Sequence, residues 1–368
     1  MSKLTKAAVL FLLICSLTGC FPTGEPNEPS SSVINSNVTV SSDKNDSDLS
    51  SSTPKEIENL KIDVPLPDSY PTELPTIKAT RRDFDAEAVK LLFIDGKTIA
   101  EDHSGNGRVT LDTTDGATLS ISKGDVTFIP DSHLFDGEDE KRAKSLMQQT
   151  AAEHVISRAF EFPHAGNELE GFSRSEALER ADELVKKLNI KYLGEPQIYA
   201  VTAEDSHNFD EEIVLNKEDE CYLVKYLTIY DDISINETGS EIFPDVFNQS
   251  SYVDVILTKD KLVKFQCHNI FDAVEETGTT QVKCSAENAL SKLFDYYDMQ
   301  VELKNRYEYD KMGFVYITSD SDFETGEFIY SPLLRVSGRC FYEQEPETGY
   351  TYYRYIDPVT GTVLNSDD

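Results

Sequence analysis

The sequence predicts an α+β fold in which helices pack on antiparallel sheets. Two amphipathic helical segments of similar pattern are each followed by several short, alternating strand segments. A smaller mixture of helix and strand signals precedes them, and a polar segment without a core-forming pattern comes before that. We therefore divide the chain into a signal peptide (1–19), a flexible tether (20–75), an N-terminal α+β region (76–172) and two helix-plus-sheet units (173–281 and 282–368).

The start of the chain has the pattern of an export signal. Lys3 and Lys6 precede an apolar run of 11 residues, 7–17. A helix needs roughly 20 apolar residues to span a bilayer, so this run is too short for a membrane helix. It predicts a secretory signal peptide.

The signal peptide ends in Leu17-Thr18-Gly19-Cys20. This motif resembles the lipobox of bacterial lipoproteins, in which an aliphatic residue and two small residues precede a cysteine. The resemblance implies that Cys20 receives a diacylglyceryl group and becomes the first residue of a mature protein on the outer face of the cell membrane, with a Gram-positive bacterium favoured as the source. Two acyl chains suffice for a stable membrane anchor. The alternative is an ordinary signal peptide with a chance cysteine.

The segment after Cys20 has the composition of a tether. Residues 21–53 are mainly Ser, Asn, Pro, Asp and Thr, and such a segment buries too little apolar surface to offset the entropy cost of ordering. The proline-spaced stretch 62–76 is expected to be more extended and to begin to pack.

The N-terminal region, 76–172, predicts two helices and a hairpin. Residues 83–94 read as a short helix capped by Asp83 or Asp85, and residues 141–162 read as a longer one. Between them, 108–121 alternate around Asp115-Gly116, which is a strong hairpin signal. Residues 124–129 are expected to add a strand.

The first helix-plus-sheet unit begins with the predicted helix 173–190. Ser173 followed by Glu176 has the spacing of a capping box. Lys259-Asp260 predicts a tight hairpin between the last two strands of the unit. The predicted strands are 196–202, 221–230, 251–258 and 261–270.

The second unit repeats this plan. Its helix, 285–299, has a similar length, cap and apolar phase, which favours a duplicated helix-then-sheet unit. The alternative is two unrelated helices with common capping chemistry. The predicted strands are 301–309, 313–318, 331–344, 351–358 and 361–364.

The end of this unit resembles the end of a PepSY domain. There, an aromatic strand is followed by an Asp-x-x-Thr-Gly turn, here Asp357 to Gly361, and a short aliphatic strand. The resemblance implies a small sheet closed against one helix and a role in regulating exported peptidases or in envelope sensing. The same residues also make a good β-turn without any homology.

The charge of the chain excludes some partners. The formal net charge is −33, and removal of the leader, which holds two lysines and no acidic residue, makes it −35. Such a surface repels nucleic acid and anionic polymers. We therefore expect no nucleic-acid partner.

The sequence contains no motif that predicts catalysis, a cofactor or a metal. None of the six histidines has a partner at a spacing suited to a metal, and the acidic stretch from Asp320 to Glu327 lacks the Gly and Glu of a calcium loop. The redox state of the mature cysteines stays open, although free thiols are favoured over disulfides and Cys284–Cys340 is the more plausible pair. These cysteines are Cys221, Cys267, Cys284 and Cys340.

Together these features predict a lipid-anchored, non-enzymatic protein that binds or regulates another envelope component, possible partners being an envelope protein or a peptidase. One alternative is a solute- or glycan-binding lipoprotein that serves a transporter, with strand tyrosines such as Tyr222, Tyr226, Tyr352 and Tyr353 forming an aromatic face. A second alternative is an envelope hydrolase with unrecognised carboxylates.

Overall fold

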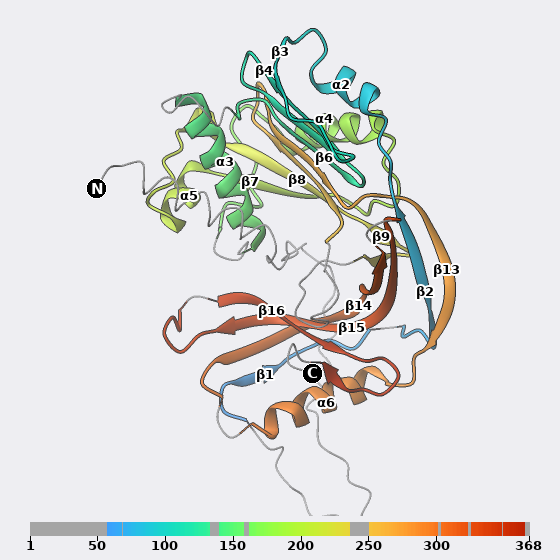
Figure 1. Ribbon diagram of the computed structural model, residues 1–368. Helices are drawn as coiled ribbons and strands as arrows, with labels where there is room; N and C mark the ends of the chain where they lie inside the picture. Colours follow the sequence, from blue (N-terminus) through green and yellow to red (C-terminus); the bar gives the residue numbers. More distant parts are fainter. Residues whose placement is uncertain are drawn as a thin grey trace, which may run out of the picture.

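A computed structural model describes residues 57–67, 69–132, 140–157, 162–235, 250–300, 303–322, 325–347 and 349–364. The predicted signal peptide, Cys20 and the tether up to residue 56 lie outside these residues. The chain forms two mainly antiparallel sheets with helices packed on them, so the predicted α+β class is confirmed. Figure 1 shows the larger sheet above and the smaller one below.

The larger sheet has eight strands in the order β3-β4-β5-β6-β12-β11-β8-β7. All neighbouring strands in it are antiparallel. The predicted hairpins at Asp115-Gly116 and Lys259-Asp260 both form. The strands are β3 (Ile99–Asp102), β4 (Val109–Thr113), β5 (Thr118–Ser122), β6 (Asp125–Ile129), β7 (Gln197–Val201), β8 (Cys221–Leu227), β11 (Tyr252–Leu257) and β12 (Leu262–His268).

Helices cover both faces of this sheet. On one face, α2 (Ala86–Phe93) and α4 (Arg174–Lys187) pack against buried residues such as Leu119, Tyr222 and Phe265. On the other face, α3 (Glu140–Ser157) and α5 (Ala203–Phe209) cover the β7–β8 side through Ala151, Val155 and Phe209. A short 3₁₀ turn, η2 (Lys217–Asp219), leads into β8.

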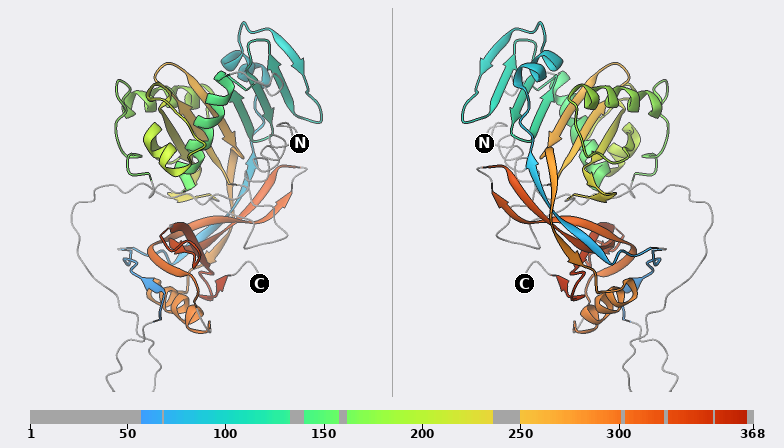
Figure 2. Two further views of the ribbon diagram at one scale, coloured as in Figure 1. Left: turned by 90° about the vertical axis from the view of Figure 1, so that its left-hand side faces the viewer. Right: turned by 90° about the vertical axis from the view of Figure 1, so that its right-hand side faces the viewer.

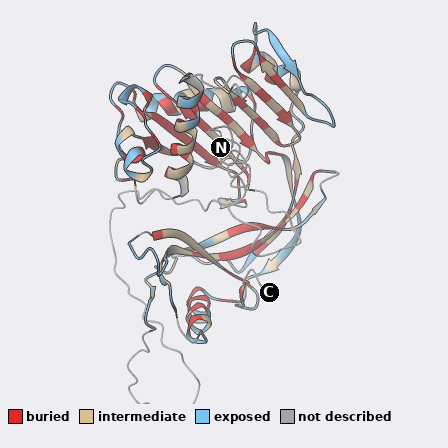
Figure 3. Ribbon diagram, turned by 60° about the vertical axis from the view of Figure 1, so that its left-hand side comes forward, coloured by how far each residue is buried: buried red, intermediate tan, exposed pale blue. Residues whose placement is uncertain are grey.

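Strands from the predicted regions 76–172 and 173–281 therefore lie in one sheet rather than in two. The junction is the pair β6–β12, in which Phe128 is opposite Phe265. The reason is that both strands present the same alternation of apolar residues toward α2 and α4, so they share one core. Figure 3 shows this continuous buried layer through the strands.

The smaller sheet has seven strands, and α6 (Ala286–Asp298) packs on it. The two strands predicted at 301–309 and 313–318 form a single long strand with a bulge between Tyr309 and Lys311. The strands are β1 (Leu60–Ile62), β2 (Glu73–Arg81), β13 (Phe271–Gln281), β14 (Arg306–Asp322), β15 (Glu327–Phe341), β16 (Gly349–Ile356) and β17 (Val363–Leu364). A separate pair, β9 (Ile229–Tyr230) and β10 (Ile233–Ser234), lies between the sheets.

Two strands of the smaller sheet connect it to the larger one. β2 leaves the smaller sheet just before α2, and β13 re-enters it directly after β12. The two strands pair with each other, with Arg81 opposite Phe271 and Glu73 opposite Gln281. Figure 2 shows this pair as the connection between the upper and lower parts.

The end of the predicted tether is packed rather than free. Residues 60–62 form β1, which pairs in parallel with β14, and the Val64 side chain is buried. The apolar residues in this stretch explain the difference, because they contact the core under α6. The tether expectation therefore does not hold for residues 57–67 and 69–75.

The two predicted helix-plus-sheet units share part of their arrangement. In each, a helix capped by a serine, Ser173 or Ser285, precedes four strands that pair in sequence order. The first unit differs in that α5, η2 and the β9–β10 pair lie between these strands and its last strand, β13, belongs to the smaller sheet. In the first unit these strands continue into β6, whereas in the second they are flanked by β1 and β2. In the part of the chain that is described, no helix combines the length and hydrophobicity needed to cross a membrane.

Candidate functional site

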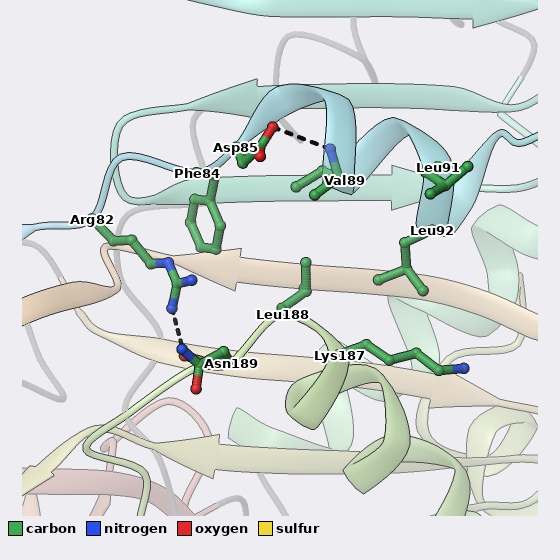
Figure 4. A pocket seen from close by; sticks show the side chains of 10 residues that line it. Arg82, Phe84, Asp85, Val89, Leu91, Leu92, Lys187, Leu188 and Asn189 are labelled. Atoms are coloured by element: carbon green, nitrogen blue, oxygen red, sulfur yellow. Dashed lines mark hydrogen bonds between the residues drawn. The ribbon is translucent and has the colours of Figure 1, made fainter.

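A groove of about 370 Å³ lies between α2 and the C-terminal end of α4 (Figure 4). Its volume is at the lower end of the range of small-ligand pockets. The two walls come from segments that are about a hundred residues apart in the sequence. The lining residues are Arg82, Phe84, Asp85, Ala88, Val89, Leu91, Leu92, Lys187, Leu188 and Asn189.

The α2 wall is fixed by the cap of the helix. The Asp85 carboxylate accepts hydrogen bonds from the amides of Glu87 (3.0 Å) and Ala88 (3.2 Å), which satisfies two of the free donors at the helix start. The helix then buries Val89 and Phe93 against the sheet. The predicted helix 83–94 and the Asp85 cap are confirmed.

The α4 wall is fixed by a left-handed turn. Asn189 follows the C-cap Leu188 with a φ of 51°, a conformation that Asn tolerates at the end of a helix. Its carbonyl oxygen points out of the turn and accepts a hydrogen bond of 2.6 Å from Arg82 Nη1. This bond connects the two walls at one end of the groove.

The floor of the groove is apolar. Phe84 and Leu92 are partly buried against the main core, and Leu188 is buried. On the rim, Leu91 exposes 66% of its surface, although the neighbouring Val89 is buried. A leucine this exposed beside an apolar floor offers contact area that nothing in the described chain covers.

Two cations stand at opposite ends of this floor, as Figure 4 shows. Arg82 lies over the Phe84 ring, with its guanidinium carbon 5.0 Å from the ring centre. At the other end, the exposed Lys187 is 3.8 Å from Glu183. Asp85 is the one acidic lining residue, and its Oδ1 is used by the helix cap. The groove thus combines an apolar floor with cationic ends in a chain of net charge −33.

A second unusual cluster lies on the smaller sheet under the end of α6. The Arg354 guanidinium carbon is 4.6 Å from the ring centre of Tyr352 and 5.6 Å from that of Tyr296. Its Nε is buried without an acceptor, and the described residues give it no ion pair. Burial raises the pKa of Tyr297 to about 12, so this neighbouring ring is neutral. The rings stabilise the cation through their faces.

The histidines fall into different environments. His164 Nδ1 is 2.7 Å from the buried Asp205, and His268 Nδ1 is 2.8 Å from Asp125. His103 differs, because it lies close to two carboxylates, those of Glu101 and Asp112. This group was not predicted from the sequence, where no histidine has a metal partner at a recognised spacing. The signal available was Glu-x-His, because His103 lies one residue beyond β3 and side chains two apart in extended chain point to the same side.

The four cysteines at 221, 267, 284 and 340 are free thiols and are buried. The structure holds no disulfide among these four, and the thiols of Cys284 and Cys340 are not bonded to each other. Burial raises the pKa of each thiol, that of Cys340 to about 11. Buried, protonated thiols behave as small apolar side chains.

The remaining sequence candidates are structural. Of the stretch from Asp320 to Glu327, residues 320–322 end β14 and Glu327 begins β15, with Asp322 opposite Glu327. Asp357 Oδ1 accepts from the amides of Val359 and Thr360, so the Asp-x-x-Thr-Gly motif forms the predicted turn. Tyr222 and Tyr226 are buried in the larger sheet, so the strand tyrosines do not form one exposed aromatic face. Cys20, the predicted lipid-attachment residue, lies outside the described residues.

The comparisons with known proteins show a shared fold and give no information on activity. No family model matches the chain, and a search of curated proteins finds no match. A crystal structure of an uncharacterized protein from Eubacterium rectale ATCC 33656 is similar, with a TM-score of 0.60 and 15% sequence identity. The similarity covers 83% of this chain and 91% of that one. It shows that the two share a fold.

Proposed function

We propose that this protein is a lipid-anchored, non-enzymatic binding or regulatory module on the outer face of the cell membrane. The proposed anchor is Cys20 in the lipobox-like motif Leu17-Thr18-Gly19-Cys20. The proposed contact surface is the groove between α2 and α4.

The choice of the groove as the contact surface rests on one observation. Leu91 is 66% exposed on the rim of an apolar floor whose two ends hold Arg82 and Lys187. Large exposed apolar side chains next to charged rims are typical of interaction sites. The chain as a whole is strongly acidic, so the cations Arg82 and Lys187 lower the repulsion that an acidic segment would meet here.

The occupant that fits is a segment of an envelope protein with one apolar side chain between acidic residues. The apolar side chain of this segment would lie on Phe84, Leu92 and Leu188. The carboxylates of its acidic residues would face Arg82 and Lys187. A volume of about 370 Å³ accommodates side chains rather than a folded element. Charge pairs at the ends would fix the orientation and speed association more than they would raise affinity.

The test is site-specific photo-crosslinking in living cells. A photoreactive residue replaces Leu91, and a matched control replaces Met299, which is 77% exposed but lies at the end of α6 on the other sheet. We expect a discrete protein adduct at position 91 that is absent at 299 and is lost when Arg82→Glu and Lys187→Glu are combined. Equal labelling at both positions, or an adduct that survives charge reversal, would overturn the groove as the contact surface.

The anchor has its own test. Cys20→Ser should abolish incorporation of labelled fatty acid and release the protein from the membrane fraction. Unchanged retention would contradict lipid anchoring and leave the groove hypothesis standing.

The alternatives predict other outcomes. A solute- or glycan-binding lipoprotein should gain thermal stability with a small ligand, following RT ln(1 + [L]/Kd). An envelope hydrolase should show turnover that one neutralised carboxylate removes.

A further inference from the structure

Three potential metal ligands converge at the outer edge of the larger sheet. Glu101 lies on β3, and His103 follows it with one residue between them. Asp112 on β4 is the cross-strand partner of Glu101. Residues two apart on a strand, and residues directly opposite across an antiparallel pair, point to the same face. One ligand atom from each of the three lies within 4.8 Å of the other two.

The two separations from His103 suit a small divalent ion. His103 Nε2 is 2.9 Å from Glu101 Oε2 and 3.5 Å from Asp112 Oδ2. Zinc bonds of about 2.0–2.2 Å in a tetrahedron put neighbouring ligand atoms roughly 3.3–3.5 Å apart. The Asp112 separation already has this value. The Glu101 separation needs to open by a few tenths of an ångström, which a side chain that is 58% exposed can do by rotation.

Asp112 is held in place from behind. Its Oδ1 accepts a hydrogen bond from the hydroxyl of Thr118, which in turn contacts the hydroxyl of Ser132. This leaves Oδ2 for the side of His103. Asp112 is also the least exposed of the three, at 22%. Partners outside the ligand set that orient a ligand in this way are typical of metal sites.

The other histidine–carboxylate pairs lack this arrangement. His164 and His268 each contact a single aspartate, and the group at His103 is the one set of three within the described residues. In the metal-free hairpin the neutral imidazole can donate its Nε2 proton to Glu101. A metal on Nε2 requires the proton to be on Nδ1 instead.

We propose that Glu101, His103 and Asp112 bind a zinc ion, with water completing the tetrahedron. The donor set selects the ion, because calcium prefers six to eight oxygen ligands and magnesium an oxygen octahedron, whereas an imidazole nitrogen with carboxylates suits zinc. The ion cross-links β3 to β4. β3 is the edge strand of the sheet and all four of its residues are exposed, so a cross-link at this position stabilises the least protected strand. The proposal does not depend on the groove.

The test is calorimetric titration of Zn²⁺ into the purified full-length mature protein in detergent, with the thiols kept reduced. We expect one site, weakened at least tenfold by His103→Ala and by Asp112→Asn. His207→Ala is the matched control, because it removes an exposed histidine that lies elsewhere, on α5, and it should bind like the wild type. Millimolar Ca²⁺ should not compete.

Two further readouts separate a site from a general surface effect. Co²⁺ should give the visible absorption bands of a tetrahedral ion in the wild type and lose them in His103→Ala. Metal-free His103→Ala should unfold like the wild type, because the side chain it removes is half exposed. Zinc binding that His103→Ala leaves intact, or that Ca²⁺ displaces, would overturn the proposal.

Discussion

Phe128 of β6 lies directly opposite Phe265 of β12, and both rings contact Phe93 of α2. The ring centres of Phe93 and Phe128 are 4.8 Å apart, and those of Phe93 and Phe265 are 5.1 Å apart. This three-ring cluster joins the strands of the N-terminal region to those of the first helix-plus-sheet unit. From this cluster we expect the larger sheet to unfold as one cooperative unit.

We therefore predict that Phe265→Ala destabilises the whole larger sheet. The free energy of unfolding should fall by about 3–5 kcal/mol, because a fully buried ring leaves a cavity. Urea denaturation followed by far-UV circular dichroism measures this. Phe341→Ala, which removes a partly exposed ring in the other sheet, should cost much less. If residues 99–129 of Phe265→Ala stayed folded while the rest of the larger sheet unfolded, the sheet would not be one cooperative unit.

Gly338 is required by the close approach of β14 to β15. A Cβ at this position would lie 2.0 Å from the carbonyl oxygen of Glu308 and 2.6 Å from Cα of Tyr309, next to the β-bulge. Gly338→Ala should therefore cost about 3 kcal/mol, at the upper end of overpacking effects. Gly313 lies on the same strand pair with nothing within 4 Å of its Cβ direction, so Gly313→Ala is the control and should change stability by about 0.5 kcal/mol or less. Equal effects of the two changes would contradict this account.

The His164–Asp205 pair should make stability depend on pH. The hydrogen bond that the His164 imidazole donates to the Asp205 carboxylate, helped by the nearby charges of Glu204 and Glu220, raises the pKa of His164. The folded state therefore favours protonated histidine, and the contribution is fully present below the ordinary pKa of about 6.5. It is lost as the pH rises through the higher folded pKa. In urea titrations from pH 5 to 9, His164→Gln should be less stable than the wild type at low pH, and the gap should close at high pH. A constant gap would mean that the imidazole acts by packing alone.

The four buried cysteines should be unreactive in the folded protein. Burial raises the pKa of each thiol, and the thiolate is the reactive species. We expect negligible alkylation by iodoacetamide at pH 8 without denaturant and complete alkylation of all four in urea. Intact-mass spectrometry without a reducing agent reads out both states. Four thiols that stay protected in urea until a reductant is added would show disulfides instead.

Local sequence signals predicted much of the fold. Asp85, Ser173 and Ser285 cap helices where the sequence placed them, and the turns at Asp115-Gly116 and Lys259-Asp260 form hairpins. These features depend on residues within a few positions of one another, so a single sequence contains the information.

The pairing of strands that are distant in the sequence could not be predicted from local signals. β2 and β13 were not predicted as strands, since their few buried residues, such as Ile77, Ala79 and Phe271, are spread among polar ones. Their pairing partners are 190 to 208 residues apart along the chain, from Arg81–Phe271 to Glu73–Gln281. The groove could not be predicted for the same reason, because Arg82 and Asn189 are far apart in the sequence and contact each other only in the folded sheet. The Glu101–His103–Asp112 group needs the β3–β4 register before its third ligand is recognisable.

The pairing of β2 with β13 has a consequence for how the molecule can be divided. Every strand of the larger sheet lies between Arg81 and Phe271, and these two residues are opposite each other in the smaller sheet. The larger sheet and its helices are thus an insertion between two paired strands, β2 and β13, of the smaller sheet. A tight turn joining the ends of β2 and β13 would close the chain of the smaller sheet without the insertion, apart from Ile235 of the inserted segment, which is buried against Tyr316 and Phe328.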